Sequence, residues 1–281
     1  MSKTLFDCTY ELARSLGVTN EGVATGGSTT TIADTVERTE DNDFWNGGSA
    51  WILYDAGGSG AAPQGEMSYV SDFATTGGVV TLRSTLTAAV AVGDKYAIAR
   101  ERYPLSLLAQ KVNEALTGVV VEKTDITTVA IAGDQTEYSL PSDVIDLKEV
   151  WIATNNDSNN NLWERTYDWQ IQKSATGTAN KIVFTNQSAT GLAVKLVYLT
   201  YHATLRAATD KLDDSIHINK VIYAAAVGCL LWRKAKVGES DPSLNELLNY
   251  YQNLSSQMNA EHAVDYPKKS AKTINLKFNR P

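Results

Sequence analysis

The sequence predicts an α+β fold in which an α-helical bundle hub carries two inserted β-rich modules and ends in an extended C-terminal arm. Three observations predict it. Apolar residues recur at helical spacing near the start, in the middle and near the end of the 281-residue chain. Short alternating runs separated by Gly-rich turns fill the intervals between them. The last sixteen residues, 266–281, contain basic side chains and no acidic one.

The first predicted element is a short amphipathic helix over residues 4–16, with Gly17 as a natural stop. Its apolar positions follow helical spacing: Leu5, Cys8, Leu12 and Leu16. Residues 22–102 then show strand-like runs. These are residues 29–35, 50–54, 66–73, 79–82 and 95–100. Several short strands separated by Gly-rich turns predict a small barrel or sandwich.

Helical spacing returns over residues 105–118, where Pro104 stands at the first turn and Gly118 at the end. A second β-rich stretch follows, with an Asn-rich loop at residues 155–161. Its strand-like runs are residues 135–140, 147–153, 163–170, 181–185 and 192–201. This stretch predicts a second small barrel or sandwich.

From Asp213 the pattern is helical again. One helix closes at Gly238, and a second opens with the capping residues Ser240 and Asp241 before Pro242. The expected domains are hub helices in residues 1–21 and 103–122, a β-rich module in residues 22–102, a second β-rich module in residues 123–205, the C-terminal helical pair of the hub in residues 206–264 and the extended basic arm in residues 265–281.

The charge is unevenly distributed. The chain carries a net charge of −7, and residues 266–281 contribute +5, so residues 1–265 carry −12. Tight binding to duplex DNA needs basic side chains that neutralise phosphates. An acidic body therefore argues against a protein that grips DNA, but it is compatible with a wall past which DNA slides.

The sequence contains no complete motif for catalysis or for a cofactor. Residues 55–65 are Gly-rich, but they lack the Lys-Ser or Lys-Thr pair of a P-loop. Residues 40–43 begin like a calcium loop, but Trp45 stands at the next ligand position and Asn46 where the loop needs Gly. Two cysteines cannot build a zinc site alone. We therefore expect a protein that is not an enzyme, with no catalytic, cofactor-binding or metal-ligating residues and no cofactor.

Neither a membrane span nor a secretory leader is predicted. The longest apolar run, residues 221–232, is too short to cross a bilayer, and the N-terminus lacks the apolar core of a signal peptide. Four aromatic residues lie in the second β-rich stretch: Trp151, Trp163, Tyr167 and Trp169. Because Arg165 is the only basic residue interleaved with them, packing in a core or a subunit interface is favoured over a carbohydrate-binding or single-strand-binding face.

The C-terminal arm carries the candidate partner-binding residues. They are Lys268, Lys269, Lys272, Ile274, Leu276, Lys277, Phe278 and Arg280. In an extended strand, Ile274, Leu276 and Phe278 share one face. This pattern predicts strand addition to a sheet edge of a partner or of a neighbouring subunit, with the lysines facing an acidic rim. The alternative is that the arm folds back on a β module of its own chain.

Two parts of the sequence resemble phage proteins. The succession of residues 29–35, 43–48, 65–73, 78–82 and 92–98 resembles a β module of tailed-phage neck and tail structural proteins. Residues 219–236 and 241–263 resemble the helical core of phage head–tail adaptors. The chain is thus similar to the tailed-bacteriophage head–tail connector family, also called adaptor or neck proteins.

The resemblance implies a structural virion protein that forms a cyclic homo-oligomeric ring, usually a dodecamer. Such a ring links the portal protein to the tail or tail-completion proteins, after assembly in the host cytoplasm. Genomic duplex DNA passes through its lumen without specific binding. One alternative is a tail-completion or other minor phage tail protein. An alternative of another class is a carbohydrate- or surface-binding β protein, which the missing leader and the long helical C-terminus disfavour.

Overall fold

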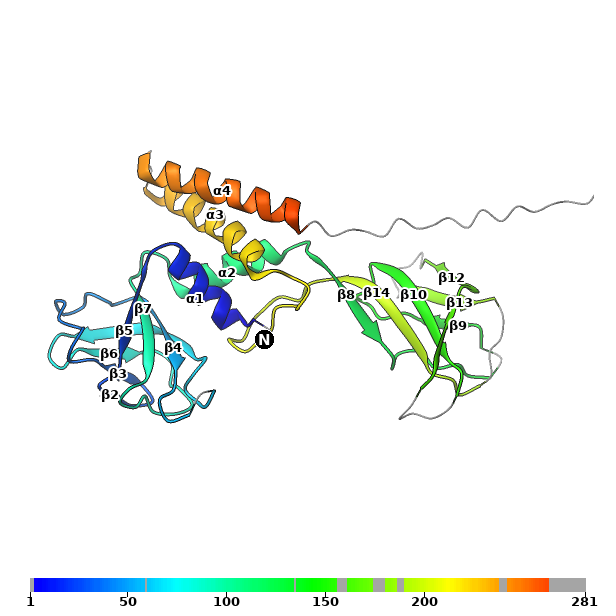
Figure 1. The fold of residues 1–281 in the computed structure, drawn as a ribbon, viewed down its shortest axis with the longest axis horizontal. Coiled ribbons are helices and arrows are strands. Elements are labelled where there is room, and N and C mark those ends of the chain that lie inside the picture. Colours follow the sequence, from blue (N-terminus) through cyan, green and yellow to red (C-terminus); the bar gives the residue numbers. More distant parts are fainter. Residues whose placement is uncertain are drawn as a thin grey trace, which may run out of the picture.

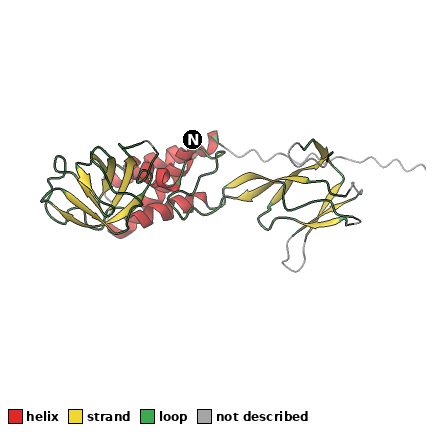
Figure 2. Cartoon of the chain, turned by 90° about the horizontal axis from the view of Figure 1, so that it is seen from below, coloured by secondary structure: helices red, strands yellow, loops and turns green. Residues whose placement is uncertain are grey.

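The computed structural model describes residues 3–58, 60–133, 135–155, 161–173, 180–185, 190–237 and 242–262. In these ranges the chain forms two β units with four helices between them (Figure 1). The view from below shows the same order, with helices flanked on each side by strands (Figure 2). No helix in these ranges is long and apolar enough to cross a bilayer.

The prediction of an α-helical bundle hub was wrong, although the fold is mixed α+β. Of the residues that the structure describes, 31% lie in strands, which form three antiparallel sheets, and 26% lie in four helices. Trp51, Ala97 and Ala99 of the first β unit lie in the same buried cluster as the helices. The helices thus share their core with a sheet. Helical periodicity marks an apolar face, but it does not say whether a helix or a sheet covers that face.

The helices lie close to where the periodicity placed them. They are α1 (Leu5–Ser15), α2 (Leu105–Leu116), α3 (Ile218–Val237) and α4 (Pro242–Glu261). A capping box starts α1, because Thr4 Oγ1 accepts from the Asp7 backbone N–H at 3.3 Å and Asp7 Oδ2 accepts from the Thr4 backbone N–H at 2.8 Å. Trp51 Nε1 donates to Thr9 Oγ1 of α1 at 3.2 Å, which fixes α1 on the sheet.

The first β unit is one seven-stranded antiparallel sheet. Its strands are β1 (Thr19–Val23), β2 (Gly26–Gly27), β3 (Thr31–Ala33), β4 (Ser49–Tyr54), β5 (Met67–Ala74), β6 (Val79–Leu82) and β7 (Lys95–Ala99). The strand order is β1-β7-β4-β5-β6-β3-β2. Only Ala24 and Thr25 separate β1 from β2, which stand at opposite ends of that order, so the sheet curls into a small barrel.

The second β unit is a sandwich of two antiparallel sheets. Its strands are β8 (Val120–Asp125), β9 (Glu137–Ser139), β10 (Asp146–Ala153), β11 (Trp163–Thr166), β12 (Trp169–Gln172), β13 (Lys181–Phe184) and β14 (Val194–Tyr201). A four-stranded sheet has the order β11-β10-β14-β8, and a three-stranded sheet has the order β12-β13-β9. Val150 and Leu196 of the first sheet share a buried cluster with Ile182 and Phe184 of the second.

Each strand-like run of the sequence contains a strand, but one run is divided in two, and β1, β2 and β8 lie outside every predicted run. Residues 163–170, expected as one run, are divided between β11 and β12. The sequence of β1, Thr-Asn-Glu-Gly-Val, contains one large apolar residue and gave no strand signal, although it pairs with β7 along its whole length. Pairing with β7 therefore stabilises β1 as a strand, although its composition has low strand propensity. The five-domain division of the chain remains a prediction.

Candidate functional site

The predicted partner-binding residues cannot be placed. Lys268, Lys269, Lys272, Ile274, Leu276, Lys277, Phe278 and Arg280 all lie outside the described residues, which end at His262. Two other features stand out within the described ranges. One is a rigid acidic turn on the barrel, and the other is a face of the sandwich where cations lie against aromatic rings.

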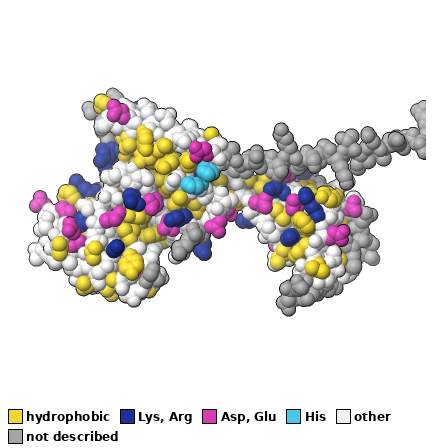
Figure 3. Space-filling view, viewed as in Figure 1, with side chains coloured by type: hydrophobic (Ala, Val, Ile, Leu, Met, Phe, Trp, Pro, Cys, Tyr) yellow, Lys and Arg dark blue, Asp and Glu magenta, His cyan; other side chains and the backbone are white. Residues whose placement is uncertain are grey.

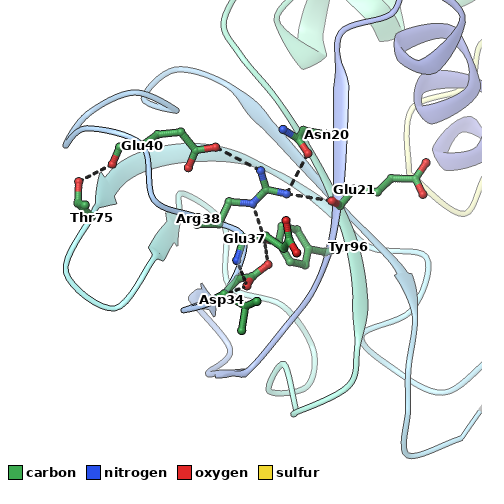
Figure 4. A network of polar contacts seen from close by, with 9 residues as sticks. Asn20, Glu21, Asp34, Glu37, Arg38, Glu40, Thr75 and Tyr96 are labelled. Atoms are coloured by element: carbon green, nitrogen blue, oxygen red, sulfur yellow. Dashed lines mark hydrogen bonds and ion pairs between the residues drawn. The ribbon is translucent and has the colours of Figure 1, made fainter.

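The acidic turn follows β3 and comprises residues 34–38. Asp34 is fully buried, and its Oδ1 accepts from the backbone N–H groups of Val36 at 3.1 Å and Glu37 at 2.9 Å. Its Oδ2 accepts from the Tyr96 hydroxyl at 2.7 Å. The carboxylate thus caps the turn and ties it to β7 (Figure 4).

Arg38 ties the same turn to β1 across the closing gap of the barrel. It is 2% exposed, its Nε donates to the Tyr96 hydroxyl at 2.7 Å, and one terminal nitrogen donates to the Glu21 carbonyl at 3.0 Å and to Asn20 Oδ1 at 3.2 Å. The other terminal nitrogen lies 3.4 Å from Glu40 Oε1 (Figure 4). The guanidinium therefore has partners on each side, which a buried charge requires.

The hydroxyl of Tyr96 joins the two charges, because it donates to Asp34 and accepts from Arg38. Burial raises the pKa of Tyr96, with the hydrogen bond to Asp34 adding to the rise and that from Arg38 opposing it. The hydroxyl stays protonated at neutral pH and can keep both bonds. The turn is thus held from three sides.

This network presents two side chains to solvent. Val36 is 68% exposed, and Glu37 is also exposed. Among the described residues, the Glu37 carboxylate makes no ion pair. A rigid turn therefore displays an apolar side chain next to an unpaired acidic one.

A cavity of about 710 Å³ lies beside this network, between the end of α1, the loop after the turn and residues 100–102. Its lining mixes carboxylates, such as Glu40 and Glu101, with the guanidinium groups of Arg100 and Arg102. Arg100 lies 4.1 Å from the centroid of the Phe44 ring, which packs against its cation. Charges of both signs suit a polar protein surface better than an apolar small molecule.

The second feature lies on the four-stranded sheet, on the side opposite the sandwich core. Trp151 of β10 stands directly across from Lys195 of β14 and from Arg165 of β11. Val150 and Leu196, their neighbours in the two strands, point into the core. Because successive side chains of a strand alternate in direction, Trp151 and Lys195 point outward. We call this surface, with Glu149 and Trp163, the cation–aromatic face.

Lys195 is held between two indole rings. Its Nζ lies 4.7 Å from the centroid of the Trp151 ring and 5.2 Å from that of Trp163. Each such contact contributes about 0.5–1 kcal/mol at an exposed site. Within the described ranges no carboxylate lies within ion-pair distance of Lys195. Its charge is oriented but not neutralised.

The rest of the face is internally paired. Glu149 Oε2 accepts from Trp151 Nε1 at 3.0 Å, and Glu149 Oε1 lies 3.1 Å from a terminal nitrogen of Arg165. The Arg165 guanidinium lies 5.1 Å from the centroid of the Tyr167 ring. The rings are thus fixed in place before any partner arrives, which lowers the entropic cost of binding.

The sequence reasoning missed Lys195. Arg165 is the one basic residue interleaved with the aromatic residues along the sequence, whereas in the fold Trp169 packs against the core and strand pairing brings Lys195 beside Trp151 and Trp163. One signal could have found it. Lys195 is the only charged residue in the strand-like run 192–201, where an exposed position of a half-buried strand is expected to carry it.

The remaining groups of chemical interest in the described ranges are the potential metal-ligating side chains and the two cysteines. The described residues contain no group of three or more His, Cys, Asp or Glu side chains that could hold a metal ion. Cys8 and Cys229 are free and buried, and burial raises the pKa of each thiol to about 12. Such thiols remain protonated at neutral pH.

A family model matches most of the chain. The family model described as SU10 adaptor protein matches residues 81–271, which include α2, the sandwich, α3 and α4. No curated protein matches the sequence. The match covers the helical stretches 219–236 and 241–263 that resemble phage adaptors, and it begins after most of the barrel. The chain therefore belongs to the SU10 adaptor protein family, a family of structural adaptor proteins of phage particles.

Proposed function

We propose that the chain is a ring-forming head–tail adaptor that links the portal protein to the tail. Twelve copies form a closed ring whose lumen belongs to the channel for genomic DNA. The observation that carries this proposal is the family match over residues 81–271, two thirds of the chain, which includes three of the four described helices. Assembly takes place in the host cytoplasm, and the mature site is the neck of the virion.

The charge distribution supports the channel role. Residues 1–265 carry a net charge of −12, whereas residues 266–281 carry +5. An acidic wall repels the phosphate backbone and keeps DNA mobile, since a basic lining would bind it in a salt-dependent way. We therefore propose that DNA passes through the ring without specific binding.

The C-terminal arm is the proposed contact with the portal protein or with a neighbouring subunit. Lys268, Lys269, Lys272, Lys277 and Arg280 supply positive charge for an acidic rim on the partner. Ile274, Leu276 and Phe278 supply apolar anchors that suit pockets beside an added strand. Burying three such side chains contributes roughly 1.5–3 kcal/mol each before ordering costs are subtracted.

The test combines imaging and binding. The purified full-length chain is examined by negative-stain electron microscopy and by light scattering after size exclusion, alone and with the portal protein of the same phage. We expect closed rings that co-migrate with portal rings. A chain that stays monomeric in both conditions contradicts the proposal, and binding to tail proteins but not to the portal favours a tail-completion protein.

A further inference from the structure

We infer that neighbouring subunits of the ring contact each other through the 34–38 turn of one copy and the cation–aromatic face of the next. This inference rests on the proposed ring. It adds the two surfaces that meet and the residues that decide the contact, Val36 and Glu37 on one side and Trp151, Trp163 and Lys195 on the other.

The placement of the two surfaces suits a ring. The turn belongs to the barrel and the face belongs to the sandwich, and these units lie at opposite ends of the described chain with the helices between them (Figures 1 and 2). A contact between two different surfaces is heterologous, and repeated heterologous contacts close into a ring when the rotation per subunit allows it. An isologous contact would pair two copies and stop.

The two surfaces complement each other in charge. The exposed acid of the turn is Glu37, and the loop that follows the turn adds the exposed Asp41 and Asp43. The outward side of the four-stranded sheet carries Lys148, Arg165 and Lys195 against Glu122 and Glu149, a net charge of +1. Figure 3 shows acidic, basic and apolar side chains interleaved on the visible faces of both the barrel and the sandwich, so the complementarity is local to the two surfaces.

The individual side chains of the two surfaces also complement each other. Glu37 and Lys195 are exposed or half-exposed charges without an ion-pair partner among the described residues. Val36, at 68% exposure, is an apolar side chain beside the acid, and two indole rings flank the lysine. Contact would pair the two charges and cover the apolar side chain with aromatic surface, the composition in which interface hot spots are enriched.

Both surfaces are fixed in advance. Asp34 and Arg38 hold the turn from within the barrel, and Glu149 and Arg165 hold the rings on the sheet. Because little conformational freedom remains to be lost, a contact of modest area can be specific. The barrel lies mostly outside the region that the family model matches, so this contact gives it a role of its own.

A charge exchange in the full-length chain tests the inference. The variants are Lys195→Glu, Glu37→Lys and the combination of both, and the readout is self-association measured by sedimentation velocity and electron microscopy. Each single variant should weaken self-association by about tenfold or more, because it places like charges opposite each other. The combined variant should recover to within about threefold of the wild type.

Lys181→Glu is the matched control, since Lys181 lies on the other sheet of the same sandwich in an exposed ion pair with Glu137. It should leave self-association unchanged. Circular dichroism checks the fold of each variant. If a carboxylate between two indoles disturbs the sandwich, Lys195→Gln and Glu37→Gln replace the reversals. Each should then weaken association, and the combination should be no weaker than either alone.

The outcomes separate this inference from the proposed function. If the wild type forms rings but the combined variant does not recover self-association, or the single variants do not lose it, the proposed contact is wrong and the adaptor ring is unaffected. A wild-type chain that forms no ring overturns both. Loss in each single variant and recovery in the combination support the contact.

Discussion

Replacing Tyr96 by phenylalanine probes the hydrogen bonds that close the barrel. The variant removes one buried hydroxyl and leaves the ring, so packing changes little. The hydroxyl donates to Asp34 at 2.7 Å and accepts from Arg38 at 2.7 Å, and all three residues are at most 2% exposed. Without the hydroxyl, the Asp34 carboxylate and the Arg38 guanidinium each lose one hydrogen bond. Because both groups are buried, water cannot replace that bond.

The magnitude follows from these two bonds. A hydrogen bond to a charged group contributes about 1.5–3 kcal/mol, so losing both should cost roughly 3–6 kcal/mol in the free energy of unfolding of the barrel. Each charged partner keeps other bonds: Asp34 to the Val36 and Glu37 amides, and Arg38 to Glu21. We therefore expect the lower half of that range.

Native-state hydrogen exchange detected by mass spectrometry is the suitable assay, because it reports the opening of β1 and β7 separately from the sandwich. Exchange of the β1 and β7 amides should accelerate by about a hundredfold, the change that corresponds to roughly 3 kcal/mol. Exchange in β10 and β14 should not change. Tyr69→Phe is the control, since no hydrogen bond of the Tyr69 hydroxyl is found within the described ranges. Acceleration below about fivefold, or equal acceleration in the sandwich, would refute the reasoning.

Three further expectations concern thiols, pH and the arm. Cys8 and Cys229 should not react with a thiol reagent at pH 8 in the folded chain and should both react in urea, because burial raises the pKa of each to about 12. The hydrogen bond from Lys123 lowers the pKa of Asp143, so its stabilising contribution is present above about pH 4 and is lost as the pH falls through the folded-state pKa. Asp143→Asn should therefore lower the urea midpoint at pH 7, and this effect should shrink as the pH falls below about 4. An effect of the same size at pH 7 and at acidic pH would contradict the assignment. Deleting residues 267–281 should leave the melting temperature of the monomer unchanged and abolish association with the portal protein; a large drop in melting temperature with association intact would show that the arm folds back on its own chain.

Much of the local structure was predictable from the sequence. The spacing of Leu5, Cys8 and Leu12 placed α1, and Gly17, with φ of 66°, ends it as a glycine in a left-handed conformation can. The Gly-rich turns between alternating runs located β4 to β7 within one or two residues. These signals are local, because a helix or a strand needs apolar residues at its own period to bury one face.

The assembly of these elements was not predictable in the same way. The helical spacing of apolar residues predicts a helix bundle. In the structure the apolar face of α1 lies against Trp51, and the helices share their core with the barrel sheet. An apolar face at helical spacing indicates that the face is buried, but it does not indicate which element packs against it. That choice depends on contacts between residues far apart in the chain.

The sequence by itself determined the positions of the helices and most strands, the acidic body, the basic arm and the resemblance to phage adaptors. Only the tertiary structure brought Lys195 between Trp151 and Trp163, and only it buried Arg38 beside Tyr96 so that Val36 and Glu37 are displayed. The reason is physical. Composition and periodicity describe which side of each element is buried, whereas strand register decides which exposed side chains meet. Trp151 and Lys195 meet because β10 pairs with β14, a strand that is distant in the sequence.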